Sequence, residues 1–255
     1  MTHVPGPSSA PPAPAIHLSD AALGFGGRLL FSGLDMVAPA GQTTCLLGPS
    51  GVGKSSLLRL IAGLLTGTGR VAADDGKPVT GRIAWMGQQD LLLPWASVLE
   101  NVTLGARLRG GRVGPAERDR AMALLAAVGL DDRAGCRPDA LSGGMRQRAA
   151  LARTLFEDRP IVLMDEPFSA LDAITRLDMQ DLAASLLAGR TVIMVTHDPL
   201  EALRLGHQVL VLSGSPARLS PPIMPAGDTP RPPDHPDLLA LQAELLLRLR
   251  GGRAA

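Results

Sequence analysis

The spacing of hydrophobic positions along the chain alternates between strand-like and helix-like, and these changes define its elements. Apolar runs predict strands at 16–25, 29–37, 43–47, 82–86, 161–164, 191–195 and 208–213. Helical spacing predicts helices over 55–64, 117–128, 143–156, 173–187 and 237–250. Between 97 and 156 only helical spacing occurs, so an all-helical segment interrupts the series of strands.

Two of the later strands have the composition of a buried parallel sheet. Residues 161–164 and 191–195 are continuous apolar runs, with a predicted helix between them. Such strands are typical of parallel sheets that are covered by helices on both faces. Asp198 and Pro199 then supply an N-cap and a first helical residue, which predicts a further helix. The pattern therefore predicts the α/β class with a mostly parallel sheet.

Proline marks the limits of the main domain. Residues 1–15 and 215–236 are rich in proline, and we expect a disordered arm in the first stretch and a linker in the second. The main domain is predicted at 16–214, with the helical insertion at about 97–156. A helix and tail follow at 237–255. The apolar stripe of this helix consists of Leu238, Leu241, Leu245 and Leu249. We expect the stripe to pack on the chain's own core rather than on a second copy.

Composition limits the partners. The 255 residues carry a net charge of +1, with four phenylalanines, two tryptophans and no tyrosine. Because there is neither a basic excess nor a set of stacking platforms, we expect no nucleic-acid partner. Cys45 and Cys136 have no metal-ligand spacing and form no disulfide framework, which favours a reduced, cytosolic compartment. We also expect no signal peptide and no membrane span.

A glycine-rich loop connects the strand at 43–47 to the helix after it. Its residues, which fit the pattern G-x-x-x-x-G-K-S, are Gly48, Pro49, Ser50, Gly51, Val52, Gly53, Lys54 and Ser55, with Ser56 next. The glycines let backbone N–H groups converge on a phosphate at the positive end of a helix. Lys54 offers a charge for the β- and γ-phosphates, and Ser55 offers a hydroxyl for Mg²⁺. The complete motif predicts a nucleotide ligand and disfavours the alternative, a plain turn with a surface lysine.

Asp165 and Glu166 follow a buried strand, at the sheet edge where α/β proteins bind ligands. Beside a phosphate loop, Asp165 is predicted to hold Mg²⁺ opposite Ser55, which leaves Glu166 free to orient or deprotonate a water. The alternative is a pair of solvated acids at a strand end.

The helix at 143–156 has a second N-terminus suited to an anion. Ser142 is a natural N-cap, and Gly143 and Gly144 leave the first N–H groups uncovered. Two such helix ends in one chain suggest a nucleotide that is held from two sides.

In order and spacing, these motifs resemble those of the nucleotide-binding subunits of ATP-binding cassette (ABC) transporters. The resemblance covers about 16–214 and consists of a Walker A loop at 48–55, a signature at 141–147, Walker B at 161–166, a D-loop at 169–172 and a switch histidine, His197. It implies a P-loop NTPase core with N-terminal antiparallel strands, an all-helical ABC subdomain, and hydrolysis of ATP with Mg²⁺.

The resemblance also implies that two copies pack head to tail. Ser142 and Gly144 of one copy would then close on the γ-phosphate that Lys54 of the other copy holds. His197 would contact this phosphate and help to position Glu166 and the water.

Further roles are implied at three positions. Asp172 would couple the two sites across the dimer. Phe25 matches an aromatic, usually tyrosine, that stacks on adenine, and its alternative role is in the core. Gln88 matches the glutamine that touches Mg²⁺ and reports nucleotide state to the membrane partner, although Gln89 follows it immediately and leaves the register open.

The segment 92–102 is similar to that of importers of nitrate, sulfonate and taurine or of thiamine-precursor pyrimidines. It lies where this family binds its permease, although Trp95 could equally be an ordinary core residue. We therefore expect an ATPase subunit of an importer, peripheral on the cytoplasmic face of the cell membrane, with a homodimer partner, permease subunits and indirectly a solute-binding protein. A soluble ABC ATPase without a permease is the alternative. A GTPase is disfavoured because no N-K-x-D motif occurs.

Overall fold

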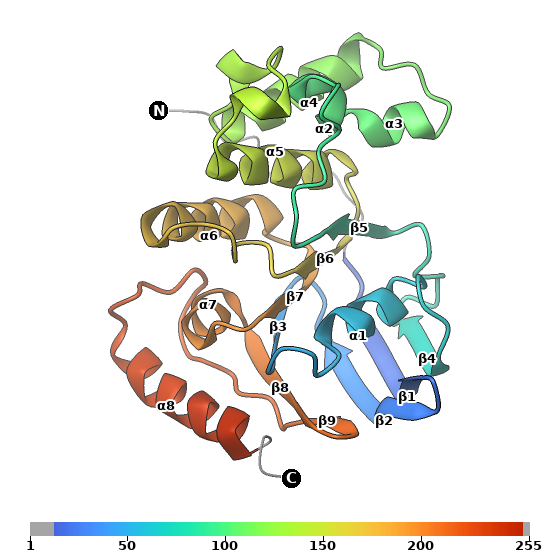
Figure 1. Cartoon of the computed structure of the whole chain (residues 1–255), viewed down its shortest axis with the longest axis vertical. Helices are drawn as coiled ribbons and strands as arrows, with labels where there is room; N and C mark the ends of the chain where they lie inside the picture. Colours follow the sequence, from blue (N-terminus) through green and yellow to red (C-terminus); the bar gives the residue numbers. More distant parts are fainter. Residues whose placement is uncertain (1–12, 252–255) are drawn as a thin grey trace.

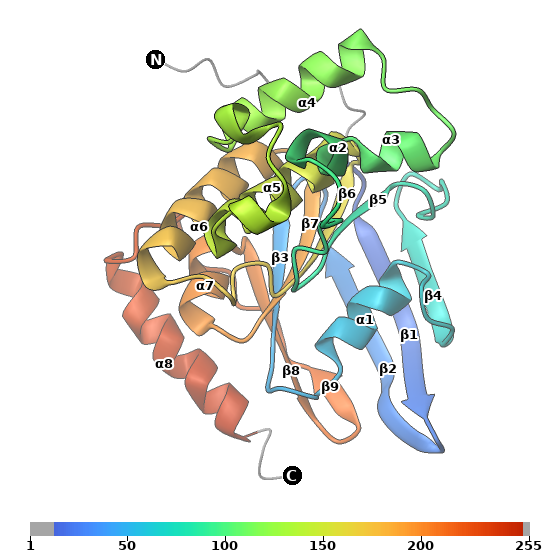
Figure 2. The same cartoon turned by 45° about the horizontal axis from the view of Figure 1, so that its top comes forward.

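The computed structural model of the chain describes residues 13–251. Most of the predicted proline-rich arm, residues 1–12, and the last residues of the predicted tail, 252–255, lie outside the described residues. Within the described part, nine strands form one sheet in the order β4-β1-β2-β9-β8-β3-β7-β6-β5. Helices cover both faces of its parallel part (Figures 1 and 2).

The parallel part of the sheet forms the centre of the molecule. Its strands are β3 (Thr43–Leu47), β5 (Ile83–Met86), β6 (Ile161–Asp165), β7 (Thr191–Thr196) and β8 (Gln208–Gly214). Every residue of β6 and β7 is buried, as their continuous apolar runs predict. The carboxyl ends of β3, β6 and β7 lie side by side because these strands pair in parallel register, with Leu47 opposite Thr196 and Asp165 opposite Val195.

Antiparallel strands form the other part of the sheet. They are β1 (Ile16–Phe25), β2 (Arg28–Ala38) and β4 (Thr68–Ala73). β1 pairs with both β2 and β4, and the β1–β2 turn brings Phe25 opposite Arg28. The predicted α/β class, with a mostly parallel sheet and N-terminal antiparallel strands, is confirmed.

Alternate residues of the buried strands enter two different cores. On one face, Leu46, Leu163 and Ile193 pack with α1 (Lys54–Ile61) and the antiparallel strands. On the other face, side chains such as Met164 and Met194 pack with the helices that follow in the chain. These helices are α5 (Gly143–Phe156), α6 (Ala173–Leu187), α7 (Pro199–Leu205) and α8 (Pro236–Gly251).

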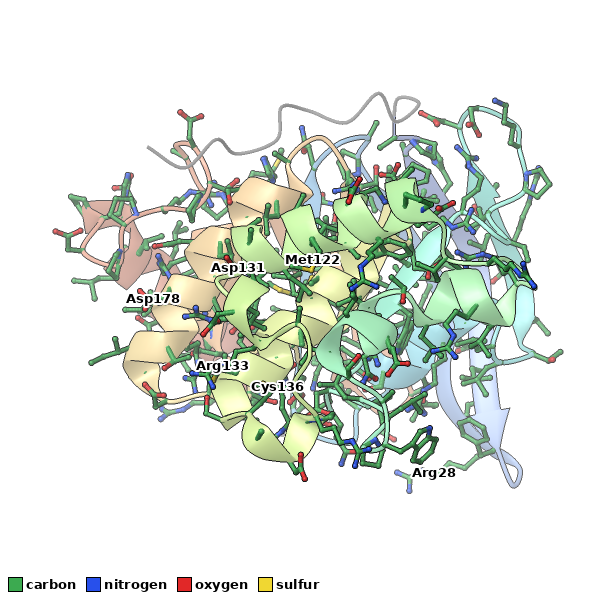
Figure 3. The ribbon with its side chains drawn as sticks, turned by 90° about the horizontal axis from the view of Figure 1, so that it is seen from above. Arg28, Met122, Asp131, Arg133, Cys136 and Asp178 are labelled. Carbon is green, nitrogen blue, oxygen red and sulfur yellow. The ribbon has the colours of Figure 1, made fainter. Side chains whose placement is uncertain are left out.

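A group of helices at one end of the molecule has a third core of its own. It consists of α2 (Val98–Val102), α3 (Leu104–Leu108), α4 (Pro115–Ala127), two 3-10 turns (Asp131–Arg133 and Pro138–Ala140) and the outer face of α5. Met122 and Cys136, labelled in Figure 3, pack against this core. The helical segment therefore rests on the sheet through α5, whose opposite face belongs to the main core.

The second proline-rich stretch contains regular structure. β9 (Ala217–Leu219) pairs with β8, and a bridge between Val209 and Ile223 extends this contact. The leucine stripe of α8 lies on the chain's own core, with Leu238 and Leu245 buried and Leu241 and Leu249 packed beside them.

Candidate nucleotide and hydrolysis site

The glycine-rich loop after β3 is too closely packed for larger residues at two positions. A Cβ at Gly48 would lie 2.5 Å from the carbonyl oxygen of Leu212, and one at Gly53 would lie 2.9 Å from Leu30. Gly53, the N-cap of α1, also has φ +113°, a region that side chains rarely adopt. At these two positions the backbone of the loop therefore lies directly against Leu212 and Leu30, which a larger residue would not allow.

Lys54 lies at the centre of this loop and is 5% exposed. Its Nζ donates hydrogen bonds to the carbonyl oxygens of Gly48 at 2.8 Å and Pro49 at 3.1 Å. Burial lowers the pKa of the Lys54 ammonium, while the charges of Glu166 and Asp165 act in the opposite direction. The ammonium therefore has carboxylate charges beside it and weak backbone acceptors that phosphate oxygens could replace.

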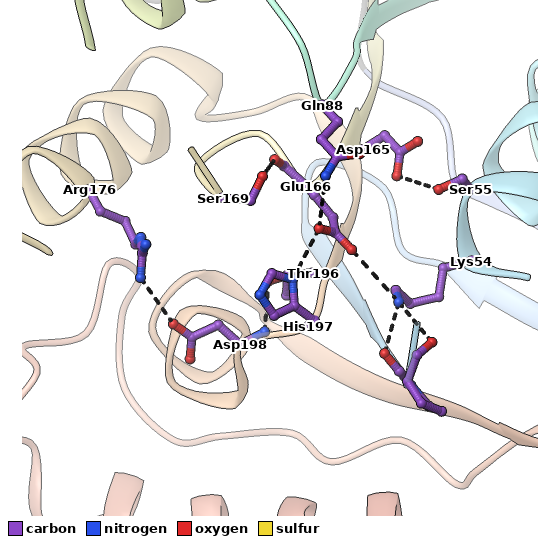
Figure 4. Close-up of polar contacts among 12 residues, drawn as sticks. Lys54, Ser55, Gln88, Asp165, Glu166, Ser169, Arg176, Thr196, His197 and Asp198 are labelled. Carbon is purple, nitrogen blue, oxygen red and sulfur yellow. Dashed lines mark hydrogen bonds and ion pairs between the residues drawn. The ribbon is translucent and has the colours of Figure 1, made fainter. Parts of the chain in front are cut away.

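Ser55 and Asp165 bring oxygen atoms together from α1 and the end of β6. The Ser55 hydroxyl donates to Asp165 Oδ1 at 2.8 Å (Figure 4). A hydroxyl and a carboxylate are hard oxygen donors of the kind Mg²⁺ prefers. No group of three or more His, Cys, Asp or Glu side chains suited to a metal occurs within residues 13–251. The pair fits Mg²⁺, which is commonly bound by few protein ligands together with substrate phosphates and water.

Glu166 has a strained backbone that its surroundings hold in place. Its φ is +48°, in the left-handed region that is costly for a side chain larger than glycine. Its N–H donates to the carbonyl oxygen of Val195 at 2.9 Å, and its carbonyl oxygen accepts from the Ser169 hydroxyl at 3.0 Å. The strained backbone at Glu166 directs its side chain toward His197, just after β7, and toward Lys54 of the phosphate loop.

Three predicted site residues converge on the Glu166 carboxylate (Figure 4). Lys54 Nζ lies 3.8 Å from Oε1, while His197 Nδ1 lies 3.0 Å and Gln88 Nε2 lies 3.5 Å from Oε2. A carboxylate oxygen only accepts, so His197 Nδ1 carries the proton in this contact. Of the two adjacent glutamines, it is Gln88 whose side chain reaches Glu166.

Phe25 lies at the opposite side of the phosphate loop and is 56% exposed. It lines a cleft of about 360 Å³ together with Arg28, Ser215 and the loop residues Pro49, Ser50, Gly51 and Val52. This volume is within the usual range for a small-molecule site. An exposed aromatic ring beside a phosphate cradle is placed to stack on a base, and its exposure argues against a core role.

The residues of the second helix end lie outside this group. Ser142 caps α5 by accepting from Met145 N–H at 3.3 Å, and Asp172 caps α6 by accepting from Thr175 N–H at 3.0 Å. Within the described part of the chain, no hydrogen bond or ion pair joins the signature residues Ser142, Gly143 and Gly144 to the group around Lys54. A Cβ at Gly144 would lie 2.9 Å from Thr175, so this glycine permits the close approach of α5 to α6.

Two polar residues near the site had no predicted role. Gln147, 3% exposed on α5, donates to the carbonyl oxygen of Gln88 at 3.3 Å. Glu201, 4% exposed on α7, lines the same small cavity as Glu166 and His197. Glu201 was recognisable as an acid in the first turn of a predicted helix, but only the packing of α7 against α6 reveals that it is buried.

These features define a P-loop nucleotide hydrolase: a phosphate loop, a hydroxyl and carboxylate pair suited to Mg²⁺, and a second carboxylate held beside the lysine. The chain belongs to the ABC transporter family, whose profile matches residues 31–169. An ABC transporter ATP-binding protein of Haemophilus influenzae, itself uncharacterised, is 43% identical over 239 residues, which cover 92% of this chain and 99% of the relative.

Other similar proteins have more specific names. The aliphatic sulfonates import ATP-binding protein SsuB of Rhodopseudomonas palustris is 44% identical over 251 residues, covering 96% of this chain and 87% of that protein. A dimeric structure of the ATP-binding cassette MJ0796 in a post-hydrolysis state with ADP and Pi has a TM-score of 0.71 and 29% identity. The match covers 84% of this chain and 100% of the MJ0796 chain.

Family membership confirms the predicted resemblance and activity: the chain is an ABC ATPase that binds and hydrolyses ATP. The neighbouring structures also confirm the P-loop NTPase fold class. Among helices in residues 13–251, none is both long and apolar enough to cross a bilayer.

Proposed function

We propose that this chain is the ATP-hydrolysing subunit of an ABC importer. It works as a head-to-tail homodimer on the cytoplasmic face of the cell membrane and drives a separate permease. The names of relatives that import aliphatic sulfonates favour a small organic anion as the solute. The observation that carries the enzymatic part is the convergence of Lys54, Gln88 and His197 on the Glu166 carboxylate.

Lys54 binds the β- and γ-phosphates of ATP. Its bonds to the Gly48 and Pro49 carbonyl oxygens hold the ammonium inside the loop, so it is already oriented when the nucleotide arrives. The loop N–H groups and the positive end of α1 supply the remaining attraction for phosphate oxygens. Phe25 stacks on the adenine from the adjoining cleft.

Ser55 and Asp165 would hold Mg²⁺, and Gln88, whose side chain reaches Glu166, would touch the metal as well. When bound, Mg²⁺ neutralises charge on the β- and γ-phosphate oxygens. The hydrogen bond between Ser55 and Asp165 keeps their oxygens facing the same point between α1 and β6.

Glu166 acts as the general base. A water oxygen attacks the γ-phosphorus and the bond to the β–γ bridging oxygen breaks, while a proton of the water passes to the Glu166 carboxylate. The products are ADP and phosphate. His197 Nδ1–H holds the carboxylate in place for this step, at 3.0 Å from Oε2.

The site is completed by a second copy. Ser142, Gly143 and Gly144 present uncovered N–H groups at the start of α5, which suit an anion. Within residues 13–251 they form no hydrogen bond or ion pair with their own phosphate loop, and the similar cassette structures are dimeric. Closure by the partner's signature segment, with Asp172 coupling the two sites, accounts for both facts.

Replacing Glu166 with glutamine tests the catalytic proposal, because the substitution keeps the shape of the side chain and removes the base. We expect kcat for ATP hydrolysis to fall by about a hundredfold or more while ATP still binds. Glu244→Gln on α8 is the matched control and should keep the wild-type rate. A Glu166→Gln rate near that of the control would refute the assignment of the base.

The transport part has its own test. A permease should co-purify with the full-length chain from membranes in mild detergent, and an alkanesulfonate should stimulate ATP hydrolysis by the reconstituted complex. If no membrane protein co-purifies, the chain is a soluble ABC ATPase. Stimulation by a nitrate or a pyrimidine alone would assign a different solute.

A further inference from the structure

A buried carboxylate lies behind the hydrolysis site. Glu201 is in the first turn of α7 and is 4% exposed. Its Oε2 accepts a hydrogen bond from Gln180 Nε2 of α6 at 3.0 Å, and the Thr196 hydroxyl also bonds to this carboxylate. A buried acid costs free energy unless it is hydrogen-bonded, so these contacts are needed for Glu201 to lie here.

Thr196 connects Glu201 to the backbone around His197. It is the last residue of β7, is 2% exposed, and accepts a hydrogen bond on its Oγ1 from Asp198 N–H at 3.0 Å. The hydroxyl thus bonds to Glu201 on one side and to the peptide after His197 on the other. His197 itself is 56% exposed, so its ring has little packing to hold it. Its position therefore depends on the backbone at each side.

The other end of this network is held rigidly. The Gln180 Oε1 atom accepts from the guanidinium of Arg204, which is 3% exposed and also bonds to Asp181 Oδ1 at 2.8 Å. The Arg204 Nε donates to the carbonyl oxygen of Arg231 at 2.9 Å. Gln180 is therefore fixed in one orientation, with its amide N–H₂ directed at Glu201.

Glu201 lies close to the hydrolysis site. It lines a cavity of about 20 Å³ together with Glu166 and His197. Burial raises the pKa of Glu201, and the charge of Asp198 adds to this, while the hydrogen bonds from Thr196 and Gln180 act against it.

We propose that Glu201 is a positioning residue for ATP hydrolysis: through the Thr196 hydroxyl it fixes the peptide that carries His197, and so keeps the imidazole against Glu166. The inference rests on the proposed roles of Glu166 and His197. It assigns no contact between Glu201 and ATP.

The test is a double-mutant cycle on the purified full-length chain, with kcat, KM and ATP affinity measured for each variant. Glu201→Ala should lower kcat about tenfold and change KM by less than about twofold, because ATP binding does not use the residue. In a His197→Ala background the same substitution should cause no further loss, because it acts through the imidazole. Glu201→Gln keeps an acceptor oxygen for Thr196 and should recover most of kcat.

Two further variants complete the test. Asp178→Ala removes an exposed carboxylate from α6, labelled in Figure 3, and should leave kcat unchanged. Thr196→Val removes only the connecting hydroxyl and should reproduce the loss seen with Glu201→Ala. If Glu201→Ala fails to fold, the kcat of Thr196→Val tests the inference in its place.

The outcomes separate this inference from the proposed function. If His197→Ala has wild-type kcat, the proposed role of His197 is wrong, whatever the Glu201 variants show. If His197→Ala is impaired and Glu201→Ala multiplies that loss by its full separate factor, Glu201 does not act through His197. Wild-type kcat in Thr196→Val would also overturn the inference.

Discussion

Arg231 anchors the C-terminal segment, and replacing it with methionine should strongly destabilise the fold. The side chain is 2% exposed although it is a guanidinium. It donates five hydrogen bonds of 2.6–3.0 Å to backbone carbonyl oxygens and has no carboxylate within ion-pair distance among the described residues. Three of the acceptors are Pro225, Ala226 and Gly227 of its own loop, and two are Leu203 and Gly206 at the end of α7.

The magnitude follows from these contacts. Hydrogen bonds to a charged group contribute about 1.5–3 kcal/mol each, so five contribute roughly 8–15 kcal/mol. Burying the guanidinium costs several kcal/mol of this. Arg231→Met leaves the carbonyl oxygens without their donor, which costs about 1–3 kcal/mol for each one that stays buried and unsatisfied, so we expect a net loss of about 3–5 kcal/mol. For a chain of this size, that corresponds to a fall in Tm of about 6–20 °C.

The assay is thermal unfolding of the full-length chain, with Arg218→Met as the control. Arg218 lies on β9 in the same segment and is exposed, so its loss should change Tm by less than about 2 °C. Arg231→Lys should be intermediate, because an ammonium has only three donors and cannot match the planar fork. If Arg231→Met unfolds at the same temperature as the control, the five hydrogen bonds do not hold this segment in place.

Two other predictions concern the nucleotide and the buried acid. Phe25→Ala should raise the Kd for ATP about 5- to 150-fold, the equivalent of the 1–3 kcal/mol of base stacking. Phe25→Tyr keeps a ring that can stack and should keep the wild-type Kd. If isothermal titration finds unchanged ATP affinity in Phe25→Ala, the adenine binds elsewhere. Glu201→Gln should flatten the dependence of stability on pH. The folded-state pKa of Glu201 is raised, so its stabilising contribution is complete below the unfolded pKa of about 4.3 and is lost as pH rises through the folded pKa. In the folded chain, the charge of Asp198 raises this pKa and the charge of Arg176 lowers it. The urea midpoint of the wild type should therefore fall more steeply than that of Glu201→Gln above about pH 4.3, and parallel curves would contradict this.

Most of the fold follows from local pattern. The buried strands β3, β6 and β7 and the helices with clear caps, such as α7 after Asp198, form where spacing and cap residues predict them. β4 and β9 were not predicted, because their pairing comes from distant partners: β4 contains a glycine and only one large apolar residue, Val71, and β9 has only three residues. In both, hydrogen bonds to a neighbouring strand supply what the local sequence lacks.

The site also contains residues that local motifs predict and residues whose burial depends on tertiary contacts. Lys54, Ser55 and Asp165 were predicted from motifs whose geometry is local to one strand end, and the parallel register of the strands brings them together. Arg231 and Glu201 could not be predicted as buried, since arginine and glutamate are nearly always exposed unless tertiary contacts satisfy them. Those contacts come from α6 and α7, about 20 to 30 residues away in the chain.

The central claim, that each site combines the phosphate loop of one copy with the signature of another, can be tested by mixing two inactive variants. Lys54→Ala lacks the phosphate charge and Ser142→Arg blocks the closing segment, so neither homodimer has an intact site. A mixed head-to-tail dimer has one intact site, made from Lys54 of one copy and Ser142 of the other. After subunit exchange, the mixture should recover up to about a quarter of the wild-type ATPase rate, because half of the dimers are mixed and each has one of two sites. If the mixture remains as inactive as the separate variants while exchange is demonstrated, the site is not shared between two copies.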